Sequence, residues 1–263
     1  MAQVRSSGSP PRIRGGIAVA LLEEPQLVYL PLWREAFCWI ESVRLKLSPV
    51  YYGCGVPHGK GAPVVVVPGL LACDLYLLEM RLWLGRMGYR AERSRIGVNA
   101  ECPDILARRL LKTIDHACDK HGEKVHLIGH SLGGLIARGV AAMIPEKVAS
   151  VITLASPFRG VRINPFVNQA LMYVRKNIAK RRECPLIDCF SSECNCTFPT
   201  ALRSKFPSGV RQTAVYCKRD GVVDWETCLS GNSRNDFEVE GTHIGLVWNA
   251  DVYRIIARRL AGA

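Results

Sequence analysis

Long apolar segments are missing from this 263-residue sequence, because no run of about 18 residues is free of charged side chains. A membrane-spanning helix needs that length, so none is predicted. The 35 Lys and Arg residues are scattered, without the aromatic platforms or recognition motif of a nucleic-acid-binding protein. The basic start is followed by a stretch broken by glutamate and proline, which makes a poor signal peptide. We therefore expect a cytoplasmic protein that does not bind nucleic acid.

Positive charge is unevenly distributed along the chain. The net charge is +12, and residues 159–208 hold nine Lys or Arg against three Asp or Glu, which is half of the excess. Such a concentration is either a solvated face or a surface that contacts anionic lipid or acidic substrates. The composition alone leaves both interpretations open.

Cysteine is abundant, with eleven residues, but its spacing argues against a structural metal site. Four of these residues lie close together, at Cys184, Cys189, Cys194 and Cys196. Their spacings differ from the paired C-x2-C knuckles that bind zinc. Local disulfides, or free thiols in a reducing compartment, fit the cluster better. No metal site is predicted.

Strand-like and helix-like segments alternate along most of the chain. The run VVVV at residues 64–67 shows no polar alternation, which indicates a strand buried on both faces of a parallel sheet. The pattern predicts an α/β fold with a doubly wound, mostly parallel sheet. Further strands are predicted over 89–96, 124–128, 148–156, 212–218 and 236–241, and helices over 73–87, 104–118, 132–144 and 246–261.

The predicted core comprises residues 62–156 and 211–263, and three other segments surround it. Residues 1–16 are expected to form a flexible tail, and 17–61 an N-terminal helical extension with a linker. A helix over 33–47 should pack its apolar face on the core. That face contains Ala36, Phe37, Ile40, Val43 and Leu47.

The insertion at residues 157–210 interrupts the alternation of strands and helices. Long insertions in compact domains are usually functional segments, so we expect a helical, cysteine-containing lid. A helix over 163–182 carries apolar residues such as Leu171 and Val174 on one side, and basic residues such as Arg175 and Lys176 on the other. The apolar side is expected to cover an apolar pocket.

A nucleophile motif stands between a predicted strand and a predicted helix. Residues 129–133 read GHSLG, a G-x-S-x-G sequence, and another glycine follows. A serine on such a tight turn is held in a strained conformation that exposes its Oγ, and the helix N-terminus favours developing negative charge. Ser131 is the candidate nucleophile.

The base and the acid are expected on loops after later strands, in the chain order Ser, Asp or Glu, His. His243 is the only histidine after Ser131, so it is the candidate base. Asp220 and Asp224 both follow the strand at 212–218, and we favour Asp220 because it comes directly before a glycine. Asp224 could instead cap a short helix. His130 is expected to pack or hydrogen-bond within the turn.

Backbone N–H groups should stabilise the oxyanion that forms when a serine attacks a carbonyl. One donor is the residue after the nucleophile, Leu132. The second is expected in the loop after the first core strand, where Pro68 has no N–H and Gly69 permits a tight bend. Leu70 is therefore the second candidate for the oxyanion hole.

The segments VVVVPGLL, VHLIGHSLGG, VITLASPFRG, RDGVVD and GTHIGLVWN together resemble the α/β-hydrolase superfamily. Within it, residues 62–262 are most similar to the bacterial triacylglycerol lipase and esterase branch. The resemblance implies an α/β-hydrolase fold and an acyl-enzyme mechanism without metal or cofactor. It places the catalytic triad at Ser131, Asp220 and His243.

These observations predict a serine carboxylic-ester hydrolase that acts on a small-molecule or lipid ester. The alternative is an acyltransferase, in which an alcohol or amine instead of water attacks the same acyl-enzyme. A polyester synthase of this fold would use cysteine at position 131, where this chain has serine. Contact with an anionic lipid surface remains an expectation for the basic segment.

Overall fold

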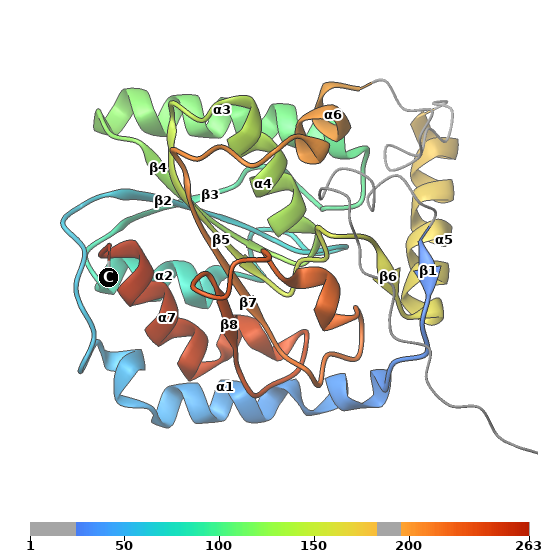
Figure 1. The fold of residues 1–263 in the computed structure, drawn as a ribbon, viewed down its shortest axis with the longest axis horizontal. Helices are drawn as coiled ribbons and strands as arrows, with labels where there is room; N and C mark the ends of the chain where they lie inside the picture. Colours follow the sequence, from blue (N-terminus) through green and yellow to red (C-terminus); the bar gives the residue numbers. More distant parts are fainter. Residues whose placement is uncertain (1–24, 183–195, 263) are drawn as a thin grey trace, which may run out of the picture.

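The computed structural model describes residues 25–182 and 196–262. A six-stranded parallel sheet in the order β3-β2-β4-β5-β7-β8 forms its centre, and helices cover both faces (Figure 1). The predicted doubly wound parallel sheet is confirmed. The strands are β2 (Pro63–Val67), β3 (Arg90–Arg93), β4 (Val125–His130), β5 (Val148–Leu154), β7 (Arg211–Tyr216) and β8 (Asp236–Glu238).

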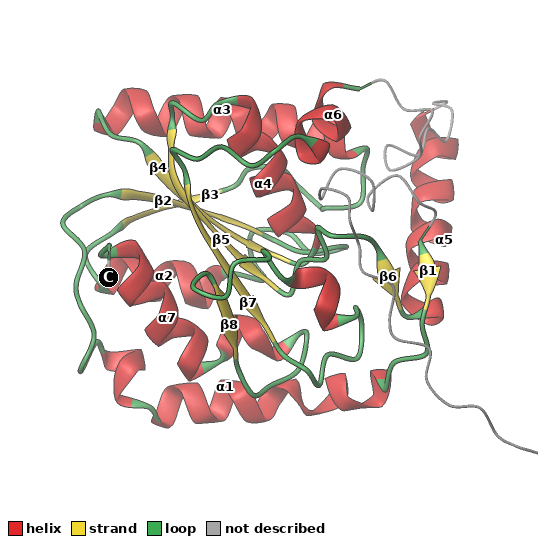
Figure 2. Ribbon diagram, in the orientation of Figure 1, coloured by secondary structure: helices red, strands yellow, loops and turns green. Residues whose placement is uncertain are grey.

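The buried strands point their side chains alternately into two separate cores. Val64 and Val66 pack with α2 (Leu78–Arg86) and α7 (Ala250–Leu260) on one face. Val65 and Val67 pack on the other face with α3 (Pro103–His121) and α4 (Leu132–Met143). Figure 2 shows these two helical layers. Burial on both sides explains why the run VVVV has no polar alternation.

The helix predicted over 73–87 begins only at Leu78. The reason is Asp74, whose Oδ1 accepts hydrogen bonds from the N–H and the hydroxyl of Ser94, at 2.9 and 2.6 Å. Its Oδ2 accepts the N–H of Arg95 at 3.0 Å. These contacts hold the segment before α2 as turns against the loop after β3, since an Asp side chain competes with helical hydrogen bonds.

The parallel register brings the carboxyl ends of the strands to one edge of the sheet. Val67 of β2 lies beside Gly129 of β4, and Tyr216 of β7 lies beside Glu238 of β8. In open α/β sheets this edge is where ligands bind. The segments directly after β2, β4, β7 and β8 carry all the site residues predicted from the sequence, with Leu132 as the first residue of α4.

The N-terminal extension is helical, but it turns the opposite face to the core from the one predicted. A 3-10 helix, η2 (Leu32–Phe37), leads into α1 (Cys38–Leu47), which runs along the outer side of α7 (Figure 1). Glu35 and Glu41 are buried, while Val43 and Leu47 are 47% and 79% exposed. The prediction of an inward apolar face is therefore wrong. The physical cause is that both carboxylates accept backbone N–H groups from core loops.

The insertion is divided between two places in the fold. Its first part, β6 (Arg162–Ile163) and α5 (Pro165–Arg182), lies beside β1 (Gln26–Leu27), which pairs with β6 in parallel. Its second part, α6 (Thr197–Arg203), is not lid-like, because Phe198 and Leu202 are buried in the core against α4. The expected lid over 157–210 therefore does not include α6, and a lid role for α5 stays a prediction.

Several expectations fall outside the described residues. These are the tail at 1–16 and three members of the cysteine cluster, Cys184, Cys189 and Cys194. Six cysteines of the described ranges are free thiols: Cys38, Cys54, Cys73, Cys118, Cys217 and Cys228. None of the helices in these ranges is long and apolar enough to cross a bilayer.

Candidate active site

Ser131 occupies a strained turn between β4 and α4. Its backbone has φ 51° and ψ −124°, a conformation that costs free energy for a residue with a side chain. The turn is possible because its neighbours are glycines. A Cβ at Gly133 would lie 2.3 Å from the carbonyl oxygen of Val67, and one at Gly129 would lie 2.5 Å from the Cα of Gly134. The motif therefore has the geometry of a nucleophile elbow.

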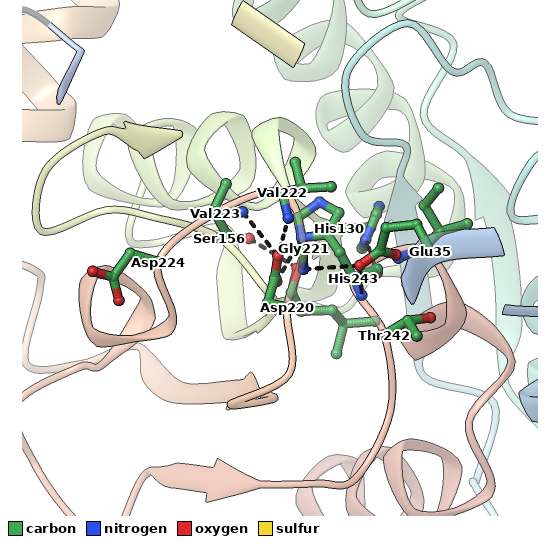
Figure 3. A network of polar contacts seen from close by, with 12 residues as sticks. Glu35, His130, Ser156, Asp220, Gly221, Val222, Val223, Asp224, Thr242 and His243 are labelled. Carbon is green, nitrogen blue, oxygen red and sulfur yellow. Dashed lines mark hydrogen bonds and ion pairs between the residues drawn. The ribbon is translucent and has the colours of Figure 1, made fainter. Parts of the chain in front are cut away.

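Asp220 and His243 meet across the loops that follow β7 and β8 (Figure 3). His243 Nδ1 lies 2.7 Å from Asp220 Oδ2, and both residues are buried. The other oxygen, Oδ1, accepts the N–H groups of Val222 and Val223 at 2.8 Å each. The carboxylate is thus fixed by three hydrogen bonds and holds the imidazole in one orientation.

Two opposing effects set the proton affinity of His243. Burial would lower its pKa, but the charge of Asp220 and the hydrogen bond to it outweigh burial, so the pKa lies above its ordinary value. His130 behaves differently, since burial and the neighbouring His243 lower its pKa to about 3. His130 is therefore neutral at neutral pH, whereas Asp220 favours the protonated form of His243.

The second candidate acid, Asp224, lies apart from His243 (Figure 3). Its Oδ1 accepts the N–H of Glu226 at 3.1 Å and caps the short helix η4 (Trp225–Cys228). Its Oδ2 lies 2.6 Å from Arg162 Nη1. Of the two carboxylates left open by the sequence, the structure thus joins Asp220 to His243 and gives Asp224 a capping role.

Leu70 and Leu132 border the same space as Ser131 and His243. Leu132 is the first residue of α4, where a backbone N–H has no acceptor within its own helix. Sequence reasoning missed Asn99, which shapes the Leu70 loop. The Asn99 side-chain amide donates to the carbonyl oxygen of Pro68 at 2.8 Å, and its backbone oxygen accepts the N–H of Leu71 at 2.9 Å.

A cavity of about 350 Å³ opens at these residues, a volume within the range of small-ligand sites. Apolar side chains from η2, the Leu70 loop and α5 line it, among them Leu32, Val167 and Leu171. Arg175 also lines it, although the sequence placed this residue on the opposite side of the helix. The expectation that α5 borders an apolar pocket next to Ser131 agrees with this geometry.

Sequence reasoning also missed the residues that hold the His243 loop. His130, which we expected to pack or hydrogen-bond within its own turn, packs against Tyr76, and its Nε2–H donates to the carbonyl oxygen of His243 at 2.9 Å. Glu35 accepts the N–H of His243 at 3.0 Å, and Glu41 accepts that of Thr242 at 2.8 Å. The sequence signal for the two glutamates is that they are the only acidic residues in the segment 32–47, which is mostly basic and apolar.

The parallel sheet and the serine elbow after β4 define an α/β-hydrolase fold. A solved structure of the metagenome-derived lipolytic enzymes LipS and LipT shares this fold, with a TM-score of 0.53 and 15% sequence identity. The match covers 79% of this chain and 95% of that chain. At this identity the likeness establishes the fold alone.

The family model described as palmitoyl protein thioesterase matches residues 63–215, which is more than half of the chain. The chain therefore belongs to this family of α/β hydrolases. It is also 33% identical over 139 residues to a triacylglycerol lipase of Burkholderia plantarii, covering 49% of this chain and 39% of the lipase. A triacylglycerol lipase of Pseudarthrobacter phenanthrenivorans is 33% identical over 118 residues, covering 41% and 37%. Both matches span less than two fifths of the lipase.

Proposed function

We propose that this protein is a serine carboxylic-ester hydrolase in which Ser131, His243 and Asp220 form the catalytic triad. One observation carries the proposal. The strained Ser131 lines the same apolar cavity as His243, whose Nδ1 is held 2.7 Å from a buried carboxylate. Nδ1–H donation to Asp220 leaves Nε2 as the free basic nitrogen of the imidazole.

The first half-reaction acylates the serine. His243 Nε2 takes the proton of Ser131 Oγ as that oxygen forms a bond to the ester carbonyl carbon. The Leu70 and Leu132 N–H groups stabilise the resulting oxyanion. The carbon–oxygen bond to the alcohol then breaks, and the imidazolium returns its proton to the departing alkoxide. Asp220 stabilises the imidazolium throughout without taking a proton.

The second half-reaction releases the acid. His243 removes a proton from water as the water oxygen attacks the acyl carbon, and the Ser131 oxygen leaves with that proton. An alcohol could take the place of water, which would make the protein an acyltransferase. The apolar lining of the cavity favours this alternative, because it excludes water from the acyl-enzyme.

The cavity also indicates the substrate class. Its lining suits the acyl chain of an ester, and α5 acts as a lid through Val167 and Leu171. The family description refers to thioesters and the relatives to triacylglycerols. Both substrate types form the same acyl-enzyme, so we propose an apolar acyl group joined to oxygen or sulfur.

A panel of p-nitrophenyl esters from acetate to palmitate tests the proposal, with matched acyl thioesters beside it. A fluorophosphonate should inactivate the protein and appear in mass spectra on Ser131. Product analysis with excess alcohol separates hydrolysis from acyl transfer. Ser131→Ala is the control and should lose both activity and labelling. Hydrolysis that persists in this variant would refute the mechanism.

We further propose that the protein meets its substrate at an anionic lipid surface through the outer stripe of η2 and α1. This stripe consists of Trp33, Phe37, Trp39, Val43 and Leu47, all of them exposed. Tryptophan favours membrane interfaces, and basic residues beside it favour anionic lipid. The two acids of this segment are buried, whereas Arg44 and Lys46 are exposed. The stripe begins next to Leu32, which lines the cavity.

Flotation with vesicles tests this surface. The wild type should bind vesicles that contain phosphatidylglycerol at low salt, and much less well vesicles of phosphatidylcholine alone. Replacing Trp33 and Trp39 by serine should weaken binding about tenfold or more, while the same change at the exposed Leu82 should not. No binding by the wild type would refute the proposal. Concentration-dependent dimers that vanish in the tryptophan variant would assign the stripe to a second copy instead.

A further inference from the structure

We propose that Glu35 is a positioning residue for the triad, whose buried carboxylate fixes the loops of the acid and the base relative to each other. The inference rests on the proposed ester hydrolysis. Glu35 comes from η2, 186 residues before Gly221, and is 5% exposed. Its Oε1 accepts the N–H of Gly221 at 2.9 Å and that of His243 at 3.0 Å. Its Oε2 accepts the N–H of Ile244 at 2.8 Å.

The bonds matter because they join two loops that follow different strands. Gly221 comes directly after Asp220 in the loop behind β7, whereas His243 and Ile244 belong to the loop behind β8. A single oxygen of Glu35 holds the Gly221 and His243 backbones together (Figure 3). Small displacements of catalytic groups are costly in rate, so a brace between the two loops acts directly on the proton transfer.

Gly221 of the acid loop fits this arrangement. A Cβ at Gly221 would lie 2.9 Å from the carbonyl oxygen of Pro31 and 3.0 Å from Oε1 of Glu35. Any larger residue would therefore push η2 away from the acid loop. Glu41, six residues further along, braces the same base loop, since its Oε1 accepts the N–H and the hydroxyl of Thr242 at 2.8 and 3.0 Å. Glu41 thus hydrogen-bonds to the base loop alone in these contacts, whereas Glu35 hydrogen-bonds to both loops.

The carboxylate of Glu35 also affects the pKa of His243. Titratable residues near His243 besides Glu35 include Asp220 at Nδ1, His130 with its ring centroid 4.9 Å away, and Tyr76 beside His130; Glu41 contacts the neighbouring Thr242. His130 is neutral, and burial raises the pKa of Tyr76, so neither carries charge at neutral pH. Asp220 and Glu35 are the two anions that raise the pKa of His243. Removing the charge of Glu35 should therefore lower it.

Three variants separate position from charge. Glu35→Gln keeps the volume of the side chain, but its NH2 group would face a backbone N–H that it cannot accept. We therefore expect kcat to fall about tenfold or more. KM for p-nitrophenyl acetate should stay within about twofold, because that small acyl group makes few contacts. The acid limb of the pH profile should move to lower pH. Glu35→Asp should lower kcat but leave the acid limb in place. Glu41→Gln, equally buried on the same segment, should leave the limb unmoved.

An NMR titration of the His243 imidazole gives a second readout that does not depend on turnover. A folded Glu35→Gln variant with wild-type kcat and an unchanged His243 pKa would overturn the inference. So would an equal shift in Glu41→Gln. If Glu35→Gln does not fold, Glu35→Asp decides, and wild-type kcat in that variant refutes the positioning role. A wild type that hydrolyses no ester would refute the proposed function, while the titration would still test the coupling of Glu35 to His243.

Discussion

Replacing Asp220 by asparagine should abolish the ability of His243 to act as a base, without disturbing the loop that carries residue 220. Oδ1 of Asp220 accepts two backbone N–H groups at 2.8 Å, and Oδ2 faces His243 Nδ1 at 2.7 Å. An amide must keep its oxygen toward the two N–H groups, because its NH2 cannot accept them. The NH2 then faces Nδ1, so the imidazole carries its proton on Nε2 and cannot take one from Ser131. We expect kcat to fall about 10³- to 10⁴-fold, which corresponds to about 4 to 5.5 kcal/mol of activation free energy.

Hydrolysis of p-nitrophenyl butyrate measures this loss, and circular dichroism establishes that the variant is folded. Asp224→Asn is the matched control. It weakens an ion pair with the partly exposed Arg162 and a helix cap, which together cost roughly 1 kcal/mol of stability. Its kcat should stay within about threefold of wild type. The reasoning is refuted if folded Asp224→Asn loses activity while Asp220→Asn retains it.

Four further outcomes are expected. The kcat/KM for a soluble ester should rise with pH through an apparent pKa above about 6.5, because only neutral His243 is a base and its pKa is raised. An acid limb below that value in a pH–rate profile would contradict the assignment of His243 as the base. Gly133→Ala would place a Cβ 2.3 Å from a β2 carbonyl oxygen and should cost at least about 3 kcal/mol in a urea titration, whereas Gly85→Ala in α2 should cost nothing. Burial lowers the pKa of His126 to about 4, so the unfolded chain binds more protons than the folded chain between about pH 6.5 and pH 4. As the pH falls through this range, His126 should therefore lower the free energy of unfolding by about 1.4 kcal/mol per pH unit. His126→Asn should lose that slope. Leu171→Asp should lower kcat/KM for long-chain esters about tenfold more than for acetate esters, and an equal loss for both would exclude α5 as a lid.

The sheet and the serine turn could be predicted because their signals are local. The apolar runs and the elbow glycines each occupy a few consecutive residues. The order of strands and helices follows directly from the order of these runs along the chain. The same order placed Asp220 and His243 after adjacent strands, and the structure brings these two residues together. The choice between Asp220 and Asp224 rested on one glycine, since both carboxylates follow the same strand.

The N-terminal segment shows what local patterns leave out. Periodicity identified the apolar stripe that contains Val43 and Leu47, but it carries no information about which side of a helix faces the core. That side is decided by Glu35 and Glu41, whose backbone partners lie 186 to 209 residues further along the chain. α6 was misassigned for a similar reason, because its contact with Gly139 of α4 is visible only after folding.

The hydrogen bonds of Glu35 can form only late in the synthesis of the chain. A nascent chain leaves the ribosome from its N-terminus, so η2 and the Ser131 turn are outside the tunnel well before His243 has been synthesised. The loop that receives Glu35 is complete only when Ile244 has emerged, some 209 residues after the glutamate. Until then the carboxylate has no partners in that loop, and the serine has no imidazole beside it. A nascent chain without His243 therefore lacks the base of the proposed triad, and Glu35 reaches its partners in that loop only after this residue has been synthesised.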